Sequence, residues 1–168
     1  MNRFQALLKA DSTPKAELER ASRQLADVVK SSRLHWWTKK ATIPTKGKAL
    51  LLVVAPFSQY DLALLDVLDA ALARLRVPKR LLSVPIYVAN LNQYETVEQL
   101  SEDIPTITQA PPQTPVAAVW ENGKLSKSAW GKEGRDLAAD ALGLSSEDLN
   151  ERVLAKVPKC TPPTWRSK

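Results

Sequence analysis

The chain has 168 residues, enough for one domain with its own core, and its apolar and charged fractions of 44% and 25% are those of an ordinary globular protein. No apolar run approaches the roughly 18 residues of a membrane-spanning helix, and the first eleven residues hold too short an apolar cluster for a secretory signal. The single cysteine, Cys160, excludes an intrachain disulfide. Together these features predict a protein of the cytoplasm, or of another reducing space, without a transmembrane segment.

The net charge of +6 is distributed unevenly along the chain. Residues 1–49 carry 11 Lys and Arg against 4 Asp and Glu, residues 50–150 carry 8 against 13, and residues 151–168 carry 5 against 1. Both ends are therefore basic and the middle is acidic. The ends are expected either to contact an anionic partner or to dock on the acidic middle of the same chain.

A helix and a short extended segment are predicted first. Residues 3–9 have the pattern of a short basic amphipathic helix. Thr13 is a suitable N-cap for a longer helix, Pro14 suits the first helical position, and the pattern ends near Ser31. The apolar residues of this second helix follow the spacing of one helical face: Leu18, Ala21, Leu25, Val28 and Val29. The start of segment 31–48 is rich in Trp and Thr, which favours a short strand that pairs with the sheet.

A strand, a helix and a second strand are predicted next. Residues 49–55 form a continuous apolar run, which is typical of a strand buried on both faces. Residues 61–75 have a wide apolar helical face, residues 83–89 have the composition of a second strand, and residues 94–103 favour a helix. The order of strand, helix and strand predicts a right-handed parallel crossover.

The rest of the chain predicts a hairpin followed by helices. Residues 116–120 form a third strand, and the dipeptide Asn122-Gly123 between two strand-like runs predicts a tight hairpin with a primed turn. The second arm of this hairpin is expected at 125–130, and a helix at 135–142. A further short helix follows, before a Pro-rich end that favours no regular structure.

In this order the elements resemble the thioredoxin superfamily over about residues 48–143. The first buried strand leads through residues 55–61, with the sequence APFSQYD, directly into a long helix. Residues 114–116, Thr-Pro-Val, match the cis-proline loop of the superfamily, and residues 121–124 form a hairpin turn before a glycine and a last helix. The resemblance implies an α/β fold: a thioredoxin-like three-layer α/β/α sandwich with a mixed sheet.

Two further parts are expected around this domain. Residues 1–47 form an N-terminal helical and basic extension, residues 48–143 form the thioredoxin-like domain, and residues 144–168 form a short C-terminal helix with a Pro-rich basic tail.

The sequence departs from the superfamily at the redox centre. The Cys-x-x-Cys pair of the superfamily stands at the start of the helix after the first buried strand, and these positions are here Ser58, Gln59, Tyr60 and Asp61. Dithiol chemistry needs a thiolate and a second, resolving thiol. A serine hydroxyl stays protonated at neutral pH and forms no reversible bond to sulfur. We therefore expect a protein that is not an enzyme of the dithiol type.

The replacement has the form of a capping box. Ser58 is expected to accept a hydrogen bond from the backbone N–H of Asp61, and Asp61 to reach back to the N–H of Ser58. Such a cap stabilises a helix by about 1 kcal/mol. The carboxylate also suits the positive end of the helix dipole. A structural role for Ser58 is therefore favoured over a catalytic one.

The resemblance also implies a surface that binds partner polypeptides. Thr114–Pro115 is expected to be a cis peptide, and main-chain groups beside such a proline pair with an extended peptide without any thiol. We name this surface the cis-proline face, and its expected members are Phe57, Ser58, Gln59, Tyr60, Thr114 and Pro115. The alternative is that this surface lost its partner together with the cysteines.

A second candidate surface combines basic and aromatic residues. Segment 33–48 and the tail supply its expected members, which are Arg33, Trp36, Trp37, Lys39, Lys40, Trp165 and Arg166. Tryptophans among lysines can stack nucleic-acid bases while the lysines contact phosphates, which gives a nucleic-acid-binding accessory protein as an alternative function. The simpler interpretation is that one tryptophan fills the core and the lysines are solvated. Trp165 in the tail would suit a protein partner.

The remaining chemistry is sparse. Cys160 follows Lys156 and Lys159, whose positive charges can lower the pKa of its thiol, so a monothiol redox protein is a further alternative. His35 is the only histidine, and one His with one Cys cannot form the usual zinc site within one chain. No Gly-rich phosphate loop is present. The sequence thus predicts no metal, no cofactor and no catalytic residue. It favours a redox-inactive adaptor or structural subunit that binds a protein partner within a larger complex.

Overall fold

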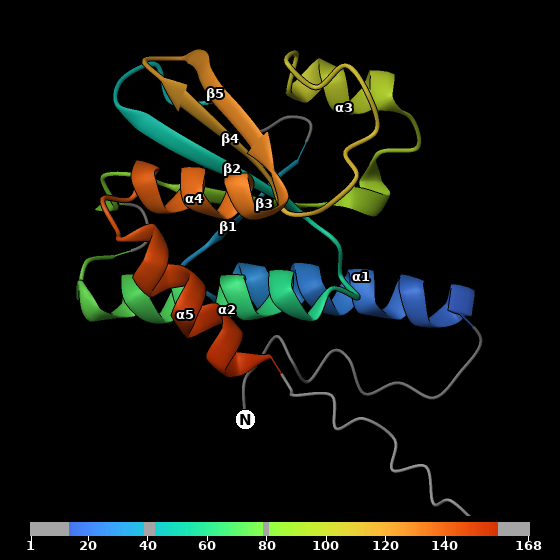
Figure 1. Ribbon diagram of the computed structural model, residues 1–168, viewed down its shortest axis with the longest axis horizontal. Helices are drawn as coiled ribbons and strands as arrows, with labels where there is room; N and C mark the ends of the chain where they lie inside the picture. The colour runs from blue at the N-terminus through green and yellow to red at the C-terminus, as the bar shows by residue number, and fades with distance from the viewer. Residues whose placement is uncertain (1–13, 39–42, 79–80, 158–168) are drawn as a thin grey trace, which may run out of the picture.

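The computed structural model describes residues 14–38, 43–78 and 81–157, and its centre is a five-stranded sheet in the order β1-β3-β2-β4-β5 (Figure 1). The strands are β1 (His35–Trp36), β2 (Lys48–Val54), β3 (Ile86–Asn90), β4 (Val116–Glu121) and β5 (Lys124–Trp130). The helices are α1 (Pro14–Ser31), α2 (Gln59–Arg74), α3 (Val97–Asp103), α4 (Gly131–Ala141) and α5 (Ser146–Lys156), with a short 3-10 turn, η3 (Leu91–Gln93). None of the described helices is both long enough and apolar enough to cross a bilayer.

The sheet is mixed, and its topology follows from one crossover and one hairpin. β1 and β2 both run parallel to β3, whereas β4 pairs antiparallel with β2 and β5 antiparallel with β4. Helix α2 connects the parallel neighbours β2 and β3, as the apolar run and the helix after it predicted. With helices on both faces, this arrangement confirms the predicted thioredoxin-like three-layer α/β fold.

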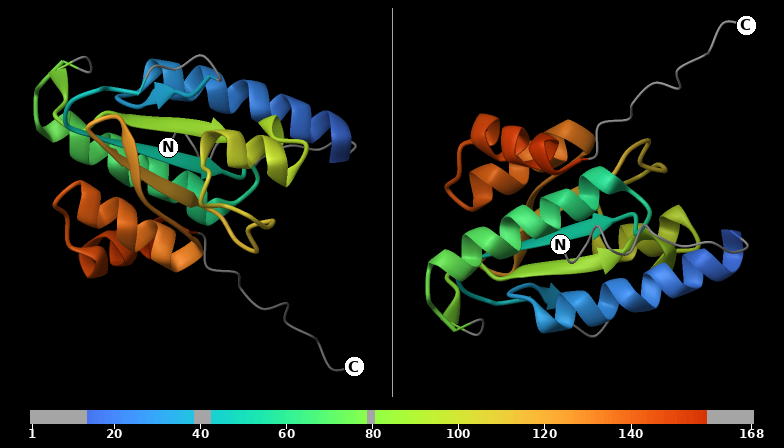
Figure 2. Two further views of the ribbon diagram at one scale, coloured as in Figure 1. Left: turned by 90° about the horizontal axis from the view of Figure 1, so that it is seen from above. Right: turned by 90° about the horizontal axis from the view of Figure 1, so that it is seen from below.

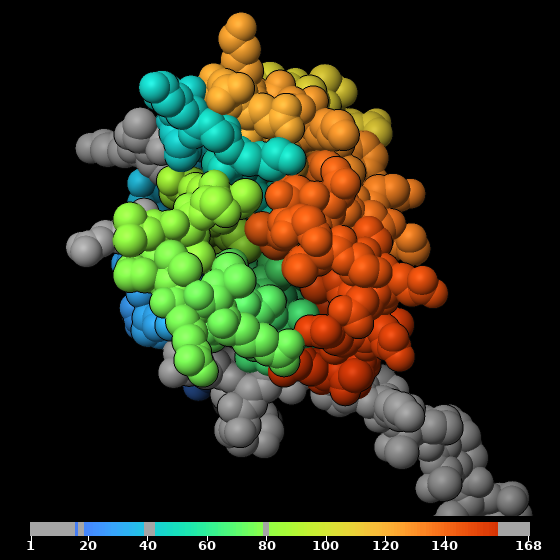
Figure 3. Space-filling view, turned by 90° about the vertical axis from the view of Figure 1, so that its left-hand side faces the viewer, coloured from blue at the N-terminus to red at the C-terminus, as the bar shows by residue number. Residues whose placement is uncertain are grey.

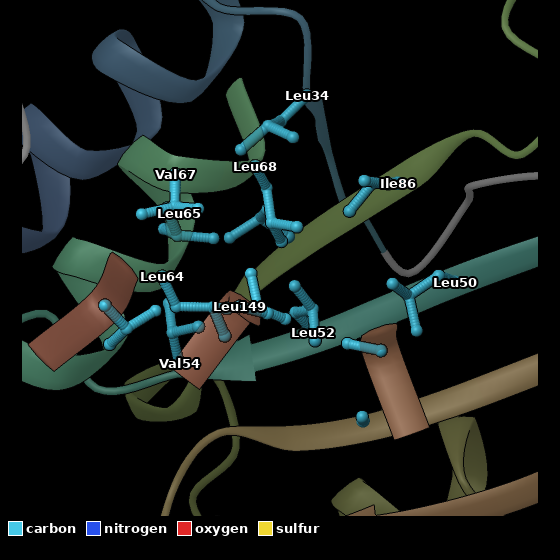
Figure 4. Packing of buried hydrophobic residues seen from close by; sticks show 14 of the residues in the cluster. Leu34, Leu50, Leu52, Val54, Leu64, Leu65, Val67, Leu68, Ile86 and Leu149 are labelled. Atoms are coloured by element: carbon cyan, nitrogen blue, oxygen red, sulfur yellow. The ribbon is translucent and has the colours of Figure 1, made fainter. Parts of the chain in front are cut away.

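The two faces of the sheet are covered unequally. Helices α1, α2, α4 and α5 contribute to one core with β2, β3 and β4, whereas α3 and the segment after it cover the other face. Figures 1 and 2 show α3 on the side of the sheet opposite α1 and α2. Figure 4 shows the side chains of Leu50, Leu52 and Val54 in β2 directed toward α2. Alternate residues of β2 are buried on each face, so every residue from Ala49 to Val54 is apolar.

The flanking helices belong to the same core as the central domain. Leu25 and Val29 of α1 are fully buried there, and Leu149 and Val153 of α5 are nearly so. Strand β1 adds to the edge of the sheet beside β3. Within the described residues, the segments before 48 and after 143 therefore contribute core side chains and an edge strand. The predicted helix at 3–9 lies outside the described residues.

The hairpin between β4 and β5 confirms the turn expected from Asn122-Gly123. Both residues have positive φ angles, 53° and 79°, as a primed turn requires. The Asn122 side chain adds a contact outside the hairpin, because its Oδ1 accepts from the backbone N–H of Gly47 at 3.0 Å. The backbone N–H of Asn122 in turn donates to the carbonyl of Gly47 at 2.9 Å. The turn is thus tied to the segment that enters β2.

Trp37 fills the core under α3. Its ring stacks on Trp120 with centroids 6.2 Å apart and meets Tyr87 edge-on. Its indole Nε1 donates to Asp103 Oδ2 at 3.0 Å, and the Tyr94 hydroxyl donates to the same oxygen at 2.7 Å. Burial, together with this hydrogen bond to Asp103, raises the pKa of Tyr94. The buried donors and their acceptor thus satisfy one another.

The structure therefore corrects the expectation that Trp37 belongs to an exposed basic and aromatic surface. Only 5% of Trp37 is exposed. Its indole packs beside Trp120 and donates a hydrogen bond to Asp103, and both contacts hold it in the core. Trp36 is half-buried and packs on the opposite core. The interpretation in which one tryptophan fills the core is confirmed.

Replacing Trp37 by alanine is expected to lower the free energy of unfolding by about 3–5 kcal/mol, since it opens a large cavity and leaves the Asp103 carboxylate without its indole donor. Leu154→Ala is the matched control, because Leu154 is exposed on α5 and its loss should change stability by less than about 0.5 kcal/mol. Urea unfolding followed by circular dichroism measures both. Equal losses in the two variants would contradict the core position of Trp37.

Candidate functional site at the start of helix α2

The site begins where β2 ends and α2 starts. Ser58 is the N-cap of α2, with extended backbone angles, and its Oγ accepts from the N–H of Asp61 at 3.3 Å. This half of the predicted capping box is confirmed. The other half is wrong: Asp61 Oδ2 accepts from the N–H of Ala55 at 2.9 Å, and the N–H of Ser58 donates to the Ala55 carbonyl instead. The Asp61 side chain points back under the turn, where it joins the end of β2 to the first turn of α2.

Asp61 is the unusual group of the site, because its side chain is fully buried. Removal from water raises its pKa from 3.8 to about 6. The Thr114 hydroxyl, the Ala55 N–H, the Arg135 guanidinium and the Ser58 hydroxyl lower the pKa by smaller amounts. Thr114 lies close enough to lower the pKa, yet Oδ1 of Asp61 meets no described residue in hydrogen-bond geometry. A carboxyl with a pKa of about 6 changes its charge inside the protein around that pH.

The loop before β4 lies against this turn. The Thr114–Pro115 peptide is cis, and Thr114 lines the same hollow as Ser58. Helix α4 packs against the loop from the other side, since the N–H of Gly131 donates to the Pro115 carbonyl at 2.9 Å. A Cβ on Gly134 would stand 2.7 Å from that carbonyl oxygen, so only glycine permits this approach. Three segments far apart in the sequence therefore meet at one point.

The close approach also corrects the predicted start of the last sheet-covering helix. The sequence predicts a helix over 135–142, with the glycines before it as turn signals, but α4 already begins at Gly131. Gly131 has a φ of 61° at the helix start, and Gly134 sits in the first turn against the Pro115 carbonyl. The glycines are needed for packing at this point, and they place the next residue, Arg135, beside the loop.

An open hollow of about 480 Å³ lies on the surface at this junction. It is lined by Ser58, Tyr60, Gln113, Thr114 and Arg135. The Arg135 Nε donates to Asn150 Oδ1 at 2.9 Å, which anchors the guanidinium to α5. The lining is polar and carries one fixed positive charge, next to the N-terminus of a 16-residue helix. Both features favour a negatively charged or carbonyl-rich ligand over an apolar one.

Two aromatic side chains, one directly before Ser58 and one in the first turn of α2, are exposed, and the second of them, Tyr60, lines the hollow. Phe57 is 60% exposed and Tyr60 is 46% exposed, so both present their rings to solvent. Gln59 is half-buried, and Pro115 is buried. Of the cis-proline face expected from the sequence, Ser58, Tyr60 and Thr114 line one hollow, whereas Phe57, Gln59 and Pro115 are their neighbours in the sequence. Pro115 contributes to the shape of this face rather than to its accessible surface.

Sequence reasoning missed Gln113 and Arg135 as members of this site. Both enter through tertiary contacts: Gln113 precedes the loop, and Arg135 lies beyond the hairpin on α4. The one available signal was the glycine pair at 131 and 134, since glycines in a helical segment indicate close backbone approach.

The second candidate surface is not assembled in the described part of the chain. The Arg33 Nη1 donates to the Val77 carbonyl at 2.9 Å and its backbone N–H donates to Asp69, so Arg33 holds the end of α1 to the end of α2. Trp36 and Trp37 pack on opposite cores. The remaining candidates lie outside the described residues: Lys39, Lys40, Trp165, Arg166 and Cys160. Among residues 14–38, 43–78 and 81–157, no group of three or more His, Cys, Asp or Glu side chains could hold a metal ion.

The topology defines a thioredoxin-like α/β fold, with Ser58 and Asp61 at the start of the helix that follows the central strand. No protein-family model and no curated protein sequence matches the chain. Among solved structures it is similar to a chain from work on the thiol resolving mechanism in yeast mitochondrial 1-Cys peroxiredoxin via glutathione/thioredoxin systems, with 11% identity and a TM-score of 0.42 over 66% of this chain and 95% of that one.

Two other solved structures are similar over 93% of this chain, each with a TM-score of 0.38. One is an HIV epitope-scaffold, with 17% identity over 92% of its length. The other is a protein of unknown function from Pseudomonas aeruginosa, with 15% identity over 89% of its length. These are likenesses of fold, and none of them bears on function.

The raised pKa of Asp61 makes stability depend on pH. The ordinary pKa of 3.8 applies to the unfolded chain and about 6 to the folded protein. Between about pH 4 and pH 6 the folded protein thus keeps a proton that the unfolded chain has lost, so the free energy of unfolding falls as pH rises through this window. A shift of this size corresponds to roughly 3 kcal/mol.

Asp61→Asn is expected to remove this contribution, because an amide does not ionise. Urea unfolding at pH 4, 5, 6 and 7.5 should show a smaller loss of stability toward high pH in the variant than in the wild type, by about 2–3 kcal/mol. All other titrating groups are common to both proteins and cancel in the comparison. Parallel pH profiles for the two proteins would show that Asp61 does not titrate in this range.

Proposed function

We propose that this chain is a redox-inactive thioredoxin-fold protein that binds an extended polypeptide segment of a protein partner at the cis-proline face. In this role it acts as an adaptor or structural subunit of a larger assembly. The observation that carries the proposal is the polar hollow lined by Tyr60, Thr114 and Arg135, together with the exposed ring of Phe57 directly before Ser58. Exposed aromatic rings around polar hydrogen-bonding groups are typical of protein-binding surfaces.

The groups at the cysteine positions support a structural rather than a catalytic role for this turn. Ser58 Oγ accepts from the Asp61 N–H and caps the helix. Asp61 Oδ2 accepts from the Ala55 N–H and holds the strand to the helix. Neither group offers the sulfur nucleophile that thiol–disulfide exchange requires. The turn keeps its shape through hydrogen bonds instead.

The geometry suits a peptide in extended conformation. Thr114 directly precedes Pro115, and main-chain groups at such a loop can pair with a peptide strand. Phe57 and Tyr60 then cover the apolar side chains of the peptide, while Arg135 and the start of α2 attract a carboxylate or carbonyl oxygen of the same segment. The basic ends of the chain add attraction to an acidic partner. The lone cysteine favours a reducing location such as the cytoplasm.

Combined replacement of Phe57 and Tyr60 by alanine is expected to weaken binding of extended peptides by at least about tenfold, which corresponds to about 1.4 kcal/mol. Truncation of exposed anchor rings at the centre of an interface costs this much or more. Binding is measured on an array of defined decapeptides with the purified wild type, the double variant and Leu154→Ala as the control. Leu154 has a comparable exposure, 59%, on α5.

Two results would contradict the proposed site. The double variant could bind the selected peptides as tightly as the wild type does. Alternatively, Leu154→Ala could weaken binding as strongly as the double variant, which would place the peptide elsewhere. Circular dichroism of all three proteins ensures that the comparison is between folded chains.

The redox-inactive role can be tested directly by introducing the two missing cysteines and measuring disulfide reductase activity. The wild type is expected to leave insulin disulfides intact, and the double variant S58C/D61C to reduce them in the presence of dithiothreitol. The start of α2 stabilises a thiolate at position 58, and a thiol at position 61 resolves the mixed disulfide. The single variant S58C, which lacks the resolving thiol, is the matched control. Turnover of insulin by the wild type would contradict a redox-inactive role.

A further inference from the structure

The far end of α2 carries an apolar cavity that the proposed function does not use. It has a volume of about 140 Å³ and lies between the last turns of α2, the segment before β3 and the turn between α4 and α5. We name it the α2-end pocket. Leu68 and Leu72 line its inner wall, and Leu82, Val84 and Leu142 line its sides. Figure 3 shows this hollow between the green segment that precedes β3 and the orange segment that ends α4.

The rim of the pocket exposes apolar side chains to an unusual extent. Leu75 is 58% exposed, Leu81 is 63% exposed and Leu144 is 39% exposed. Leu75 and Leu144 themselves line the cavity, and Leu81 directly precedes a lining residue. Three large aliphatic side chains around one cavity form a patch, which marks an interaction surface rather than scattered exposure.

The size of the cavity indicates what can enter it. An engineered protein cavity of about 150 Å³ with aliphatic walls binds benzene, so the α2-end pocket can take one side chain of the size of leucine or phenylalanine. A cavity with side walls binds a single inserted side chain better than it binds a flat partner surface. This geometry favours a protein segment over a lipid bilayer.

The charges beside the pocket indicate the flanks of that segment. Arg74 and Arg76 are exposed on either side of Leu75, and the Arg33 guanidinium is bound to the Val77 carbonyl close by. Residues 74–80, RLRVPKR, contain four cations and no carboxylate. In the elements that line the pocket, the carboxylates closest in sequence to lining residues are Asp69 and Asp140. Asp69 already accepts a hydrogen bond from the Arg33 N–H. The loop itself therefore attracts negative charge.

The same charge argues against the two ends of the chain as occupants. Residues 158–168 carry three cations and no carboxylate, and residues 1–13 carry two cations and one carboxylate. Either end would bring positive charge to a positive rim. An acidic segment with an apolar anchor meets both the cavity and the rim.

We propose that the α2-end pocket is a docking site for a segment of a partner protein that inserts one leucine-sized or phenylalanine-sized side chain and carries acidic residues on both sides of it. The site lies at the C-terminal end of α2, whereas the cis-proline face lies at its N-terminal end. The chain thus has two separate surfaces for protein partners, one at each end of the same helix. This proposal does not depend on the peptide-binding role of the cis-proline face.

The test uses the full chain and two matched peptides, Asp-Glu-Leu-Phe-Glu-Asp and Lys-Arg-Leu-Phe-Arg-Lys, titrated to millimolar concentration. Methyl and amide NMR signals report the contacts. The acidic peptide is expected to shift the signals of Leu72, Leu82 and Leu144, while those of Tyr60 and Thr114 stay in place. The basic peptide is expected to bind at least tenfold more weakly, and added salt should reduce this difference.

Two variants separate the apolar and the charged parts of the site. Ala71→Phe fills the cavity, because Ala71 lines it, and is expected to weaken the acidic peptide at least tenfold. The surface variant R74E/R76E keeps the cavity and is expected to weaken the acidic peptide to the level of the basic one. Lys127→Glu, at an exposed position of β5, is the charge control and should leave binding unchanged.

Several outcomes would overturn the proposal. The two peptides could bind equally, or neither could shift the pocket signals. The pocket signals could move on deletion of residues 158–168 without any peptide, which would assign the cavity to the tail. Binding to anionic lipid vesicles that R74E/R76E abolishes and Ala71→Phe leaves intact would assign the surface to membranes.

Discussion

The hydrogen bond from the Ala55 N–H to the buried carboxyl of Asp61 holds the functional end of this fold together. It connects Ala55, the first residue after the central strand β2, to the first turn of the helix that follows. Thr114, on the loop before β4, lowers the pKa of the same carboxyl, so the loop lies against this junction. A buried carboxyl is costly to ionise. The hydrogen bonds of Asp61 and Ser58 hold the turn between β2 and α2 in place despite that cost.

Helix α2 gives the molecule two different ends. Its first turn is polar, with Ser58 as the cap and Arg135 of α4 beside it. Its last turns are apolar and basic, with Leu72 in a cavity wall and exposed arginines around Leu75. Between them, the buried side chains of α2 pack on β2. One rigid helix therefore fixes the separation between the two surfaces for which we propose protein partners.

Much of the fold was predictable, because local patterns specify it. The apolar run of β2, the helical periodicity of α2 and the Asn122-Gly123 turn each determine an element without reference to the rest of the chain. The site was harder to predict from the sequence. Ser58 could be recognised as a cap from its position, but the carboxyl of Asp61 turns to Ala55 because burial under the turn offers that donor.

Tertiary proximity accounts for what the sequence did not show. Arg135 reaches the site because Gly134 lets α4 approach the Pro115 carbonyl. In the sequence alone, a glycine in a polar segment indicates a turn as readily as a close helix contact. Trp37 lies in a segment of lysines and threonines that looks exposed, yet it is buried because Trp120 and Asp103, more than 60 residues later, provide its partners. The α2-end pocket likewise combines three separate segments.

The central claim is that Asp61 is a buried structural carboxyl in the first turn of α2, and its own titration tests this most directly. The carboxyl carbon of Asp61, assigned by NMR in the folded wild type, reports its protonation between pH 3 and pH 8. The account predicts a midpoint near the pKa of about 6 that burial gives this group. A midpoint at or below the ordinary value of 3.8 would mean a solvated or ion-paired carboxylate, and would contradict the account.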